Sequence, residues 1–452
     1  MMNSQVAAAS TALLTDRYEL TMLQAALADG TAHRRTIFEV FTRRLPPGRR
    51  YGVLAGTGRV LEAIEAFRFD TDALRWLAHE KVVDAATLDY LAGYRFTGDV
   101  TGYAEGEVFF PGSPVLHVEG TFAEAVLLET VVLSALNYDS AIASAASRMT
   151  SAAGSRPCLE MGARRAHEQA AVAAARAAVI GGFAGTSDLE AGRRYGLATI
   201  GTAAHAFTLL HDDEEAAFAS QIRSQGSGTT LLVDTYDVRR GVERALAAGG
   251  PGLGAVRLDS GDLGSLAHEV RAQLDEAGAT GTKITVTSDL DEYAIAALAA
   301  APVDSYGVGT ALVTGSGAPT CGMVYKMVAR VGSDGTMEPV AKVSAAKASV
   351  GGRKGAARGL GATGRAVEEV VVTGSDEAVL AWQDRVRSTP PDRLRPLQVP
   401  LVSHGEVDQA WTGPAGVQAA AARHAASRAE LPRGALRLSA DEAELETVTL
   451  AV

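Results

Sequence analysis

The chain has 452 residues, and its 42 Lys and Arg against 53 Asp and Glu give a formal net charge of −11 at pH 7. This length is enough for roughly two to three domains with a sizeable core. The acidic balance argues against a general nucleic-acid or membrane-surface binder, because both need a basic field. Only two cysteines, Cys158 and Cys321, are present, which excludes a disulfide scaffold and a thiolate zinc cluster.

The sequence also predicts a protein without a targeting or membrane segment. Residues 1–12 have no basic start and no long apolar run, so we expect no signal peptide. The alanine-rich stretch 169–180 contains Arg176 and is too short to cross a bilayer. We therefore expect a soluble, cytoplasmic protein that binds neither membrane nor nucleic acid.

The first third of the chain mixes helical spacing with alternating apolar residues, which predicts helices beside a small sheet. In chain order we expect a helix over 13–28 with Thr15 or Asp16 as its N-cap, an alternating segment over 38–45, a helix over 54–67, short antiparallel strands over 96–120 and a long helix over 121–149.

From Cys158 onward, apolar strand-like runs end in polar residues, and amphipathic helices follow them. The clearest runs end at His205, Asp237, Asp262, Asp289 and Thr310. Such βα units, recurring about every 20–30 residues, predict a parallel sheet with helical crossovers. An open doubly wound sheet and a closed β/α barrel both fit. Catalytic-type side chains at several strand ends favour the barrel, where these ends converge on one mouth.

Beyond about residue 345 the pattern weakens. Residues 344–365 are basic and glycine-rich, which predicts a loop. A strand is expected over 367–374, a helix over 416–430 and a last strand near the C-terminus. No P-loop is present, and Gly359, Gly361 and Gly364 match a dinucleotide pattern that no strand leads into, so a flexible loop is the better interpretation.

The strand-end residues suggest a site for a sugar phosphate. The run RLDSGD places four of them, Arg257, Asp259, Ser260 and Asp262, at one strand end. Carboxylates accept hydrogen bonds from ribose hydroxyls and hold Mg²⁺ through water. The alternative is a buried Arg–Asp pair with a structural role. Gly307, Gly309 and Thr310 follow a later strand, where glycines allow backbone N–H groups to approach a phosphate or simply form a turn.

Two further groups of residues are candidates for the same mouth. His205 shares it with Asp234, and an Asp that holds one imidazole nitrogen protonated frees the other as base or nucleophile. Adjacent Arg164 and Arg165 suggest a fork for carboxylate or phosphate, with one of them facing the site. The turn GTSD, which includes Thr186, could line the same pocket. The structural alternatives are a satisfied polar histidine and a solvated helix start.

Taken in order, these motifs resemble those of the nicotinate phosphoribosyltransferase family, actinobacterial type. The resemblance covers roughly residues 12–360. It runs through TDRYELTM, NYDSAIASAASRM, EMGARRAHE, GTAAHAF, LLVDTYD, RLDSGDL, YGVGT and KVSAAKASVGGRK.

This resemblance implies an α/β fold, an irregular β/α barrel of the phosphoribosyltransferase type plus an α/β sandwich domain. The implied domains are 12–127 for the N-terminal sandwich, 128–330 for the catalytic barrel and 331–452 for a C-terminal segment that returns to the sandwich with an added helix. It also implies a homodimer with active sites shared between subunits.

The implied reaction joins nicotinate to 5-phosphoribosyl 1-pyrophosphate. It gives nicotinate mononucleotide and pyrophosphate for NAD salvage, with Mg²⁺ as cofactor and ATP hydrolysis coupled through a phosphohistidine. The resemblance implies His205 as that histidine and Asp234 as the residue that orients it.

The resemblance also implies the remaining site residues. Tyr18 would stack on the ring in the partner's site, Arg164 would meet nicotinate or phosphate, and Arg257 with Asp259 would line the ribose and base site. Ser260 and Thr186 are further candidates for substrate binding, Gly307, Gly309 and Thr310 match the 5′-phosphate loop, and Asp259 with Asp262 are candidates for Mg²⁺ through water.

Four positions depart from the family pattern. Met161 replaces a phenylalanine that stacks on the pyridine ring, although a thioether is a workable substitute. Asp188 replaces asparagine and would repel the substrate carboxylate, so nicotinamide is a competing substrate. Gly352 replaces a proline, and the segment 137–147 lacks a lysine found in many members.

Two other functions remain open. The first is a non-catalytic relative that binds nucleotide and regulates a partner. The second is an unrelated phosphate-binding barrel such as an aldolase, which would need a Schiff-base lysine at a strand end. Neither Lys283 nor Lys326 occupies such a position.

Overall fold

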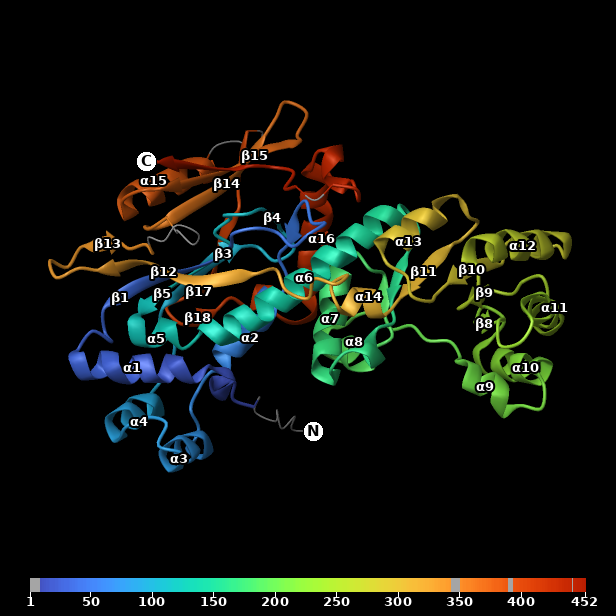
Figure 1. Ribbon diagram of the computed structural model, residues 1–452, viewed down its shortest axis with the longest axis horizontal. Coiled ribbons are helices and arrows are strands. Elements are labelled where there is room, and N and C mark those ends of the chain that lie inside the picture. Colours follow the sequence, from blue (N-terminus) through green and yellow to red (C-terminus); the bar gives the residue numbers. More distant parts are fainter. Residues whose placement is uncertain (1–8, 343–349, 389–392, 441) are drawn as a thin grey trace. The chain divides into compact units, whose positions relative to one another are not determined.

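The computed structural model describes residues 9–452 apart from 343–349, 389–392 and 441. The chain divides into two compact units (Figure 1), the first formed by residues up to 144 together with 320–452 and the second by residues 145–319. The sequence places the boundaries after 127 and 330 instead. Residues Val131 and Leu136 of helix α6 (Glu129–Ala153) pack in the core of the first unit, and β12 (Met323–Val331) pairs with β1 (Arg35–Thr42) there. The chain therefore leaves the first unit later, and returns to it earlier, than expected.

The first unit is built on a seven-stranded sheet of order β13-β12-β1-β5-β3-β17-β18, in which every pairing is antiparallel. Its other strands are β3 (Asp99–Tyr103), β5 (Leu116–Thr121), β13 (Met337–Pro339), β17 (Gln398–Ser403) and β18 (Glu406–Val407). The short β2 (Gly52–Val53) pairs with β4 (Val108–Phe109). The antiparallel strands expected over 96–120 are thus confirmed.

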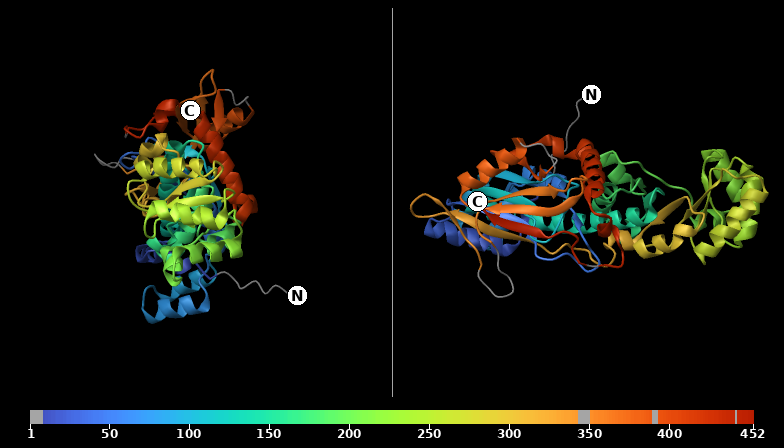
Figure 2. Two further views of the ribbon diagram at one scale, coloured as in Figure 1. Left: turned by 90° about the vertical axis from the view of Figure 1, so that its right-hand side faces the viewer. Right: turned by 90° about the horizontal axis from the view of Figure 1, so that it is seen from above.

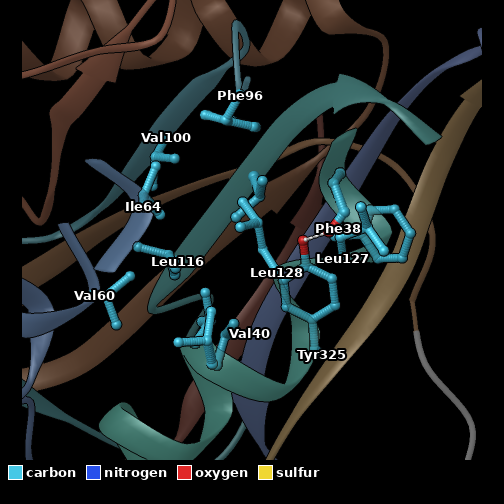
Figure 3. Packing of buried hydrophobic residues seen from close by; sticks show 14 of the residues in the cluster. Phe38, Val40, Val60, Ile64, Phe96, Val100, Leu116, Leu127, Leu128 and Tyr325 are labelled. Atoms are coloured by element: carbon cyan, nitrogen blue, oxygen red, sulfur yellow. Dashed lines mark hydrogen bonds between the residues drawn. The ribbon is translucent and has the colours of Figure 1, made fainter. Parts of the chain in front are cut away.

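Helices of this unit supply the other side of its core. They are α1 (Arg17–Asp29), α2 (Thr57–Glu65), α3 (Thr71–His79), α4 (Ala85–Ala92), α5 (Phe122–Val126) and the first part of α6. In this core, whose packing is drawn in Figure 3, the rings of Phe38 and Tyr325 stack with centroids 4.8 Å apart, and the Tyr325 hydroxyl donates to the Ala125 carbonyl at 2.8 Å. The single helix expected over 121–149 is two helices, because the chain turns at residues 127–128 where Leu127 and Leu128 are buried.

A four-stranded sheet of order β16-β14-β15-β19 completes the first unit, with strands β14 (Lys354–Leu360), β15 (Ala366–Thr373), β16 (Leu394–Pro396) and β19 (Thr447–Ala451). Helix α15 (Asp376–Ser388) packs against β14 and β16 of this sheet, and α16 (Gly413–Glu430) packs against α2 and β4. The expected strands near 367–374 and the C-terminus and the helix near 416–430 are confirmed.

The glycine-rich loop predicted over 344–365 is wrong for residues 354–360 and is confirmed for 350–353 and for the turn at 361–365, while residues 344–349 lie outside the described residues. Residues 354–360 form β14, and Gly361–Gly364 closes the hairpin to β15. A Cβ at Gly355 would lie 2.9 Å from Trp382, and one at Gly359 would lie 2.7 Å from Glu368. These glycines mark close packing in a strand rather than flexibility.

The second unit contains a six-stranded, wholly parallel sheet of order β7-β6-β11-β10-β9-β8 that curls into a half-barrel. Its strands are β6 (Cys158–Glu160), β7 (Gly185–Thr186), β8 (Thr230–Leu232), β9 (Ala255–Leu258), β10 (Lys283–Val286) and β11 (Ser305–Val308). The mixed α/β fold with a parallel barrel-type sheet and a separate domain is confirmed.

Eight of the described α-helices lie wholly within this unit and connect or flank its strands: α7 (Glu168–Ile180), α8 (Leu189–Tyr195), α9 (His205–Leu210), α10 (Glu214–Gln225), α11 (Val238–Gly249), α12 (Leu263–Glu276), α13 (Glu292–Ala297) and α14 (Thr310–Val313). Figures 1 and 2 show α10, α11 and α12 side by side near β8 and β9. Across the described residues, no helix has the length and apolar character that membrane crossing requires.

One predicted strand of this unit is wrong. Residues 198–205 form no strand, and Thr199 makes only an isolated bridge to Thr186. His205 therefore lies at the start of α9 instead of at a strand end. An apolar run becomes a strand only where a neighbour offers a continuous ladder of partners, which this segment lacks.

Candidate active site

A cavity of about 1030 Å³ opens in the second unit, beside the carboxyl ends of β6, β9, β10 and β11. Seven of the predicted site residues line it: Arg164, His205, Arg257, Asp259, Gly307, Gly309 and Thr310. Asp234, Ser260, Thr186 and Asp262 belong to the same unit but are not in its lining, and Tyr18 belongs to the first unit. The sheet therefore gathers residues from four strand ends around one space.

His205 is held by a residue that the sequence analysis did not single out. Its Nδ1 lies 3.2 Å from the Thr235 hydroxyl oxygen. Its Nε2 lies 3.9 Å from Asp234 Oδ1 and 3.8 Å from Asp259 Oδ2, so neither carboxylate is within hydrogen-bond distance. With 40% of the side chain exposed, the imidazole is accessible between two carboxylates.

Asp234 is buried beside this imidazole and has one oxygen unused. Its Oδ2 accepts hydrogen bonds from the backbone N–H of Asp259 at 2.9 Å and from the Ser260 hydroxyl at 2.7 Å. Its Oδ1 has no hydrogen-bond partner among the described residues. Ser260 thus holds Asp234 through Oδ2, while the free Oδ1 can accept a hydrogen bond from a protonated nitrogen of His205.

Arg257 and Asp259 both face the cavity, and each is fixed by a threonine. Arg257 Nη1 donates to the Thr202 hydroxyl oxygen at 2.9 Å, and the Thr287 hydroxyl donates to Asp259 Oδ1. Burial lowers the pKa of Arg257, and the nearby carboxylates of Asp259 and Asp234 oppose this shift. Its Nε is buried without a partner in the part of the chain that the structure describes. The guanidinium therefore retains a donor for an anionic ligand.

Both arginines of the pair Arg164–Arg165 line the cavity, although we expected only one to do so. The reason is local, because they end a short 3₁₀ turn (Ala163–Arg165) at the rim instead of lying along an α-helix. With Arg257 they give the cavity three cationic side chains.

Below this rim, the buried Glu160 joins two segments of the wall. Its carboxylate accepts from the Gly162 N–H and from the Thr186 hydroxyl, and burial raises its pKa. Thr186 is therefore part of the wall's internal bonding, and its neighbour Ser187 faces the cavity instead. The Asp188 carboxylate caps α8 by accepting from the Ala191 N–H at 2.8 Å, and it does not line the cavity.

The predicted phosphate loop serves two purposes. Gly309 and Thr310 line the cavity at the start of α14. A Cβ at Gly307 would lie 2.6 Å from Met161 Sδ and 2.5 Å from Thr287 Cγ2, so this glycine is required for packing under the cavity wall. Met161 itself lines the cavity beside it.

The two predicted Mg²⁺ carboxylates have different roles. Asp262 caps α12, accepting from the Ser265 N–H at 3.2 Å and the Ser265 hydroxyl at 3.0 Å, and these bonds lower its pKa. Asp259 faces the cavity, as does Asp289. Among the described residues no group of three or more His, Cys, Asp or Glu side chains could hold a metal ion. A cation here would need oxygens from a bound substrate.

Tyr18 lies on α1 with 44% of its surface exposed. Its hydroxyl bonds to Glu129, and burial, together with the charge of Glu129, raises its pKa. Leu13, Leu14 and Met22 are also exposed, so this part of the first unit presents an apolar surface.

Comparison with known proteins decides the family. The model of the nicotinate phosphoribosyltransferase (NAPRTase) N-terminal domain matches residues 13–137. Nicotinate phosphoribosyltransferase pncB1 of Mycobacterium tuberculosis is 56% identical over 448 residues, which cover 97% of this chain and 95% of the relative. The chain belongs to the nicotinate phosphoribosyltransferase family. The family predicted from the motifs is thereby confirmed.

Other nicotinate phosphoribosyltransferases and related structures agree with this assignment. The Bacillus subtilis enzyme is 39% identical over 356 residues, covering 76% of this chain and 72% of its own. The crystal structure of human nicotinic acid phosphoribosyltransferase superposes with a TM-score of 0.80 at 25% identity, covering 96% and 97% of the two chains. A nicotinate-nucleotide pyrophosphorylase from Pyrococcus furiosus gives 0.74 at 25% identity, covering 95% and 99%.

Proposed function

We propose that this protein is a nicotinate phosphoribosyltransferase that joins nicotinate to 5-phosphoribosyl 1-pyrophosphate and hydrolyses ATP through a phosphohistidine at His205. The product, nicotinate mononucleotide, would feed NAD synthesis. The observation that carries the proposal is the grouping of His205, Arg257 and Asp259 around one cavity, with Asp234 behind, in a chain 56% identical to a protein of that name.

The cavity chemistry suits anionic substrates. Arg164, Arg165 and Arg257 offer charge-assisted hydrogen bonds to the pyridine carboxylate and the phosphates. The Met161 thioether can contact the pyridine ring. Asp259 can accept from ribose hydroxyls, while Gly309 and Thr310 at the start of α14 are positioned for the 5′-phosphate.

In the proposed transfer, the bond between ribose C1′ and pyrophosphate breaks with its electron pair on the pyrophosphate, and the pyridine nitrogen bonds to C1′. The ribose becomes cationic on the way, so the Asp259 carboxylate stabilises it while the arginines stabilise the leaving group. Asp259 and Asp289 are the cavity carboxylates able to hold Mg²⁺ together with substrate oxygens, and the ion when bound would neutralise pyrophosphate charge.

For the ATP step, we propose that the γ-phosphoryl group moves from ATP to a nitrogen of His205, with ADP leaving, and that water later releases it as phosphate. Asp234 would stabilise the resulting charged ring, because its free Oδ1 lies on the side of Nε2. That leaves Nδ1, now beside the Thr235 hydroxyl, as the phosphoryl acceptor.

A labelling experiment tests the ATP step. The wild type incubated with [γ-³²P]ATP should acquire acid-labile label, and His205→Ala should acquire none. His211→Ala is the matched control, because His211 directly follows α9 as its C-cap, has its Nδ1 bonded to the Phe207 carbonyl and does not line the cavity. Unlabelled wild type, or labelled His205→Ala, would contradict the proposal. Pyrophosphate release by the wild type separates an enzyme from a non-catalytic relative.

We propose nicotinate over nicotinamide because the cavity lining includes three arginines, whereas the Asp188 carboxylate is engaged at the α8 N-terminus. Comparing kcat/KM for the two pyridines tests this preference. A higher value for nicotinamide would reverse it.

We also propose a cytoplasmic homodimer in which Tyr18 enters the partner's site. The exposed apolar surface around Tyr18 supports the dimer, and two buried free cysteines suit a reducing compartment. Mixing inactive Tyr18→Ala and His205→Ala proteins should restore partial activity, since mixed dimers would contain one intact site. No recovery after verified subunit exchange would contradict a shared site.

A further inference from the structure

Residues 201–204 lead directly into His205 and have few attachments. The chain makes its last bridge to the sheet edge at Thr199 and Ile200, where the Ile200 N–H donates to the Thr186 carbonyl at 2.9 Å. Beyond it, the Ala204 carbonyl accepts from Phe207 within α9. Among the described residues, the one hydrogen bond that joins 201–204 to the strands is the bond between the Thr202 hydroxyl and Arg257 Nη1, at 2.9 Å.

Arg257 offers a fixed anchor for this segment. It lies in β9, which is paired on both sides, opposite Thr285 of β10 and Leu232 of β8. Its guanidinium faces the cavity, and its buried Nε is unpartnered in the described structure. The same group can therefore hold Thr202 with one nitrogen and a substrate phosphate with its other donors.

His205 depends on where this segment lies. Its ring makes one hydrogen bond, to Thr235, and stands 3.8–3.9 Å from two carboxylates without bonding to either. A small shift of residues 201–204 would change both distances. The position of the imidazole is thus linked, through three residues of chain and one hydroxyl, to the guanidinium that faces the sugar phosphate.

We propose that Thr202 is a positioning residue that couples phosphoribosyl pyrophosphate binding at Arg257 to phosphorylation of His205. This inference rests on the proposed function and deepens it. Ordering of Arg257 by the substrate fixes Thr202 and the segment that ends at His205. A phosphoryl group on His205 fixes the same segment from its other end and favours the Arg257 position that binds substrate. The two effects are equal in size, because linkage between two sites is reciprocal.

The test compares Thr202→Val with Thr202→Ser. Valine has nearly the shape of threonine and lacks the oxygen that Arg257 uses, whereas serine retains it. The KM for phosphoribosyl pyrophosphate is measured with and without ATP, and ATP hydrolysed per mononucleotide is measured at saturation. In the wild type we expect ATP to lower this KM about tenfold, a common size of coupling between sites. In Thr202→Val the KM ratio should fall to near one and ATP use per product should rise, while Thr202→Ser should behave like the wild type.

Two controls separate the possible failures. Thermal melting shows whether Thr202→Val is folded, and if it is not, Thr202→Ala replaces it with the same expectation. A wild type that forms no mononucleotide would overturn the proposed function itself. An active wild type whose KM does not respond to ATP, a Thr202→Val that keeps the full response, or a Thr202→Ser that loses it would overturn the role of the Thr202 hydroxyl and leave the proposed function standing.

Discussion

Three buried carboxylates of the first unit differ from the carboxylates beside the cavity of the second unit in how many of their oxygens already have partners. In the first unit, Glu39 accepts from Lys354 at both oxygens and also bonds to His117. Glu107 accepts from Arg395 at both oxygens, and Glu369 from Tyr103 at one and Arg358 at the other. The Glu39 group joins β1, β5 and β14. The Glu107 and Glu369 groups join the C-terminal four-stranded sheet to segments that precede it in the chain. All three groups leave little capacity for a ligand.

In the second unit, the charged groups at the cavity are only partly engaged. One oxygen of Asp234 has no partner among the described residues, and Asp259 turns one oxygen toward His205 at a distance of 3.8 Å. A buried polar group without a partner lowers the free energy of unfolding, so it is retained where another role compensates for that loss. The difference separates charges that hold the fold together from charges kept ready for substrate, and the following substitutions test that separation.

Asp259→Asn should have the largest effect on activity. It keeps the shape and the bond to Thr287 but removes the charge that faces His205 and the proposed ribose site, so we expect kcat/KM to fall about 100-fold. The melting temperature should stay close to that of the wild type. Steady-state kinetics and thermal melting check both, and a stable protein with nearly full activity would show that this carboxylate is not engaged in the reaction.

Lys354→Met should chiefly affect stability. Removing one partner of a buried pair typically costs about 3–5 kcal/mol. The matched control is Lys326→Met, which removes a partly exposed lysine 3.7 Å from Glu129 and should cost at most about 1 kcal/mol. Denaturant unfolding measures the two losses. Equal losses would show that the buried Lys354–Glu39 pair contributes no more to stability than the partly exposed Lys326–Glu129 pair.

The same buried pairs predict loss of stability in acid. Burial alone would raise the pKa values of Glu39 and Glu107. His117 and Lys354 hold the pKa of Glu39 below the ordinary value, and Arg395 does the same for Glu107. Their stabilisation is therefore complete above the unfolded glutamate pKa of about 4.3 and is lost as the pH falls through the lowered folded values. Glu369, whose pKa burial raises, acts in the opposite sense. Melting curves from pH 7 to pH 3 should show the net loss, and Lys354→Met should flatten it.

Asp262→Ala should have a smaller effect than either. Its carboxylate caps α12 and lies outside the cavity lining, so the melting temperature should fall slightly, with kcat and the Mg²⁺ dependence unchanged. Titrating activity with Mg²⁺ checks this expectation. A weakened Mg²⁺ response would return Asp262 to the metal site that the sequence suggested.

Asp188→Asn should have the smallest effect. Asparagine also caps helices, and the carboxylate it replaces does not face the cavity. We expect the ratio of kcat/KM for nicotinate and nicotinamide to change by less than about twofold, since repulsion falls off with distance and solvent screening. A large shift toward nicotinate would show that the Asp188 charge reaches the pyridine site.

The regular βα pattern was predictable because the strands are mostly buried apolar runs and five of the described helices, α8, α10, α11, α12 and α13, begin after an Asp cap. Asp237, Asp262 and Asp291 all accept from the first turn of the helix that follows them. The segment ending at His205 has the same composition but no ladder partner beyond Thr186, and β14 is a strand in spite of its glycines. Both differences depend on tertiary neighbours that a local pattern does not contain.

The candidate site was predictable in its charged residues and not in its hydroxyls. Arg257, Asp259 and His205 stand out by type and motif. Thr202, Thr235 and Thr287 each bond to one of them, yet threonine is common in strands and loops, and its bonding depends on the register of distant segments. A Thr within three positions of a candidate charged residue was the one available signal, as with Thr202 three positions before His205 and Thr235 directly after Asp234.

The two cysteines have a practical consequence. Cys158 lies in the second unit and Cys321 in the first, and both are buried, with thiol pKa values raised to about 12 by burial. A thiol reagent should therefore modify neither residue until its own unit opens. Mass spectrometry of timed alkylation would then follow the opening of each half of the native enzyme separately, without any introduced label.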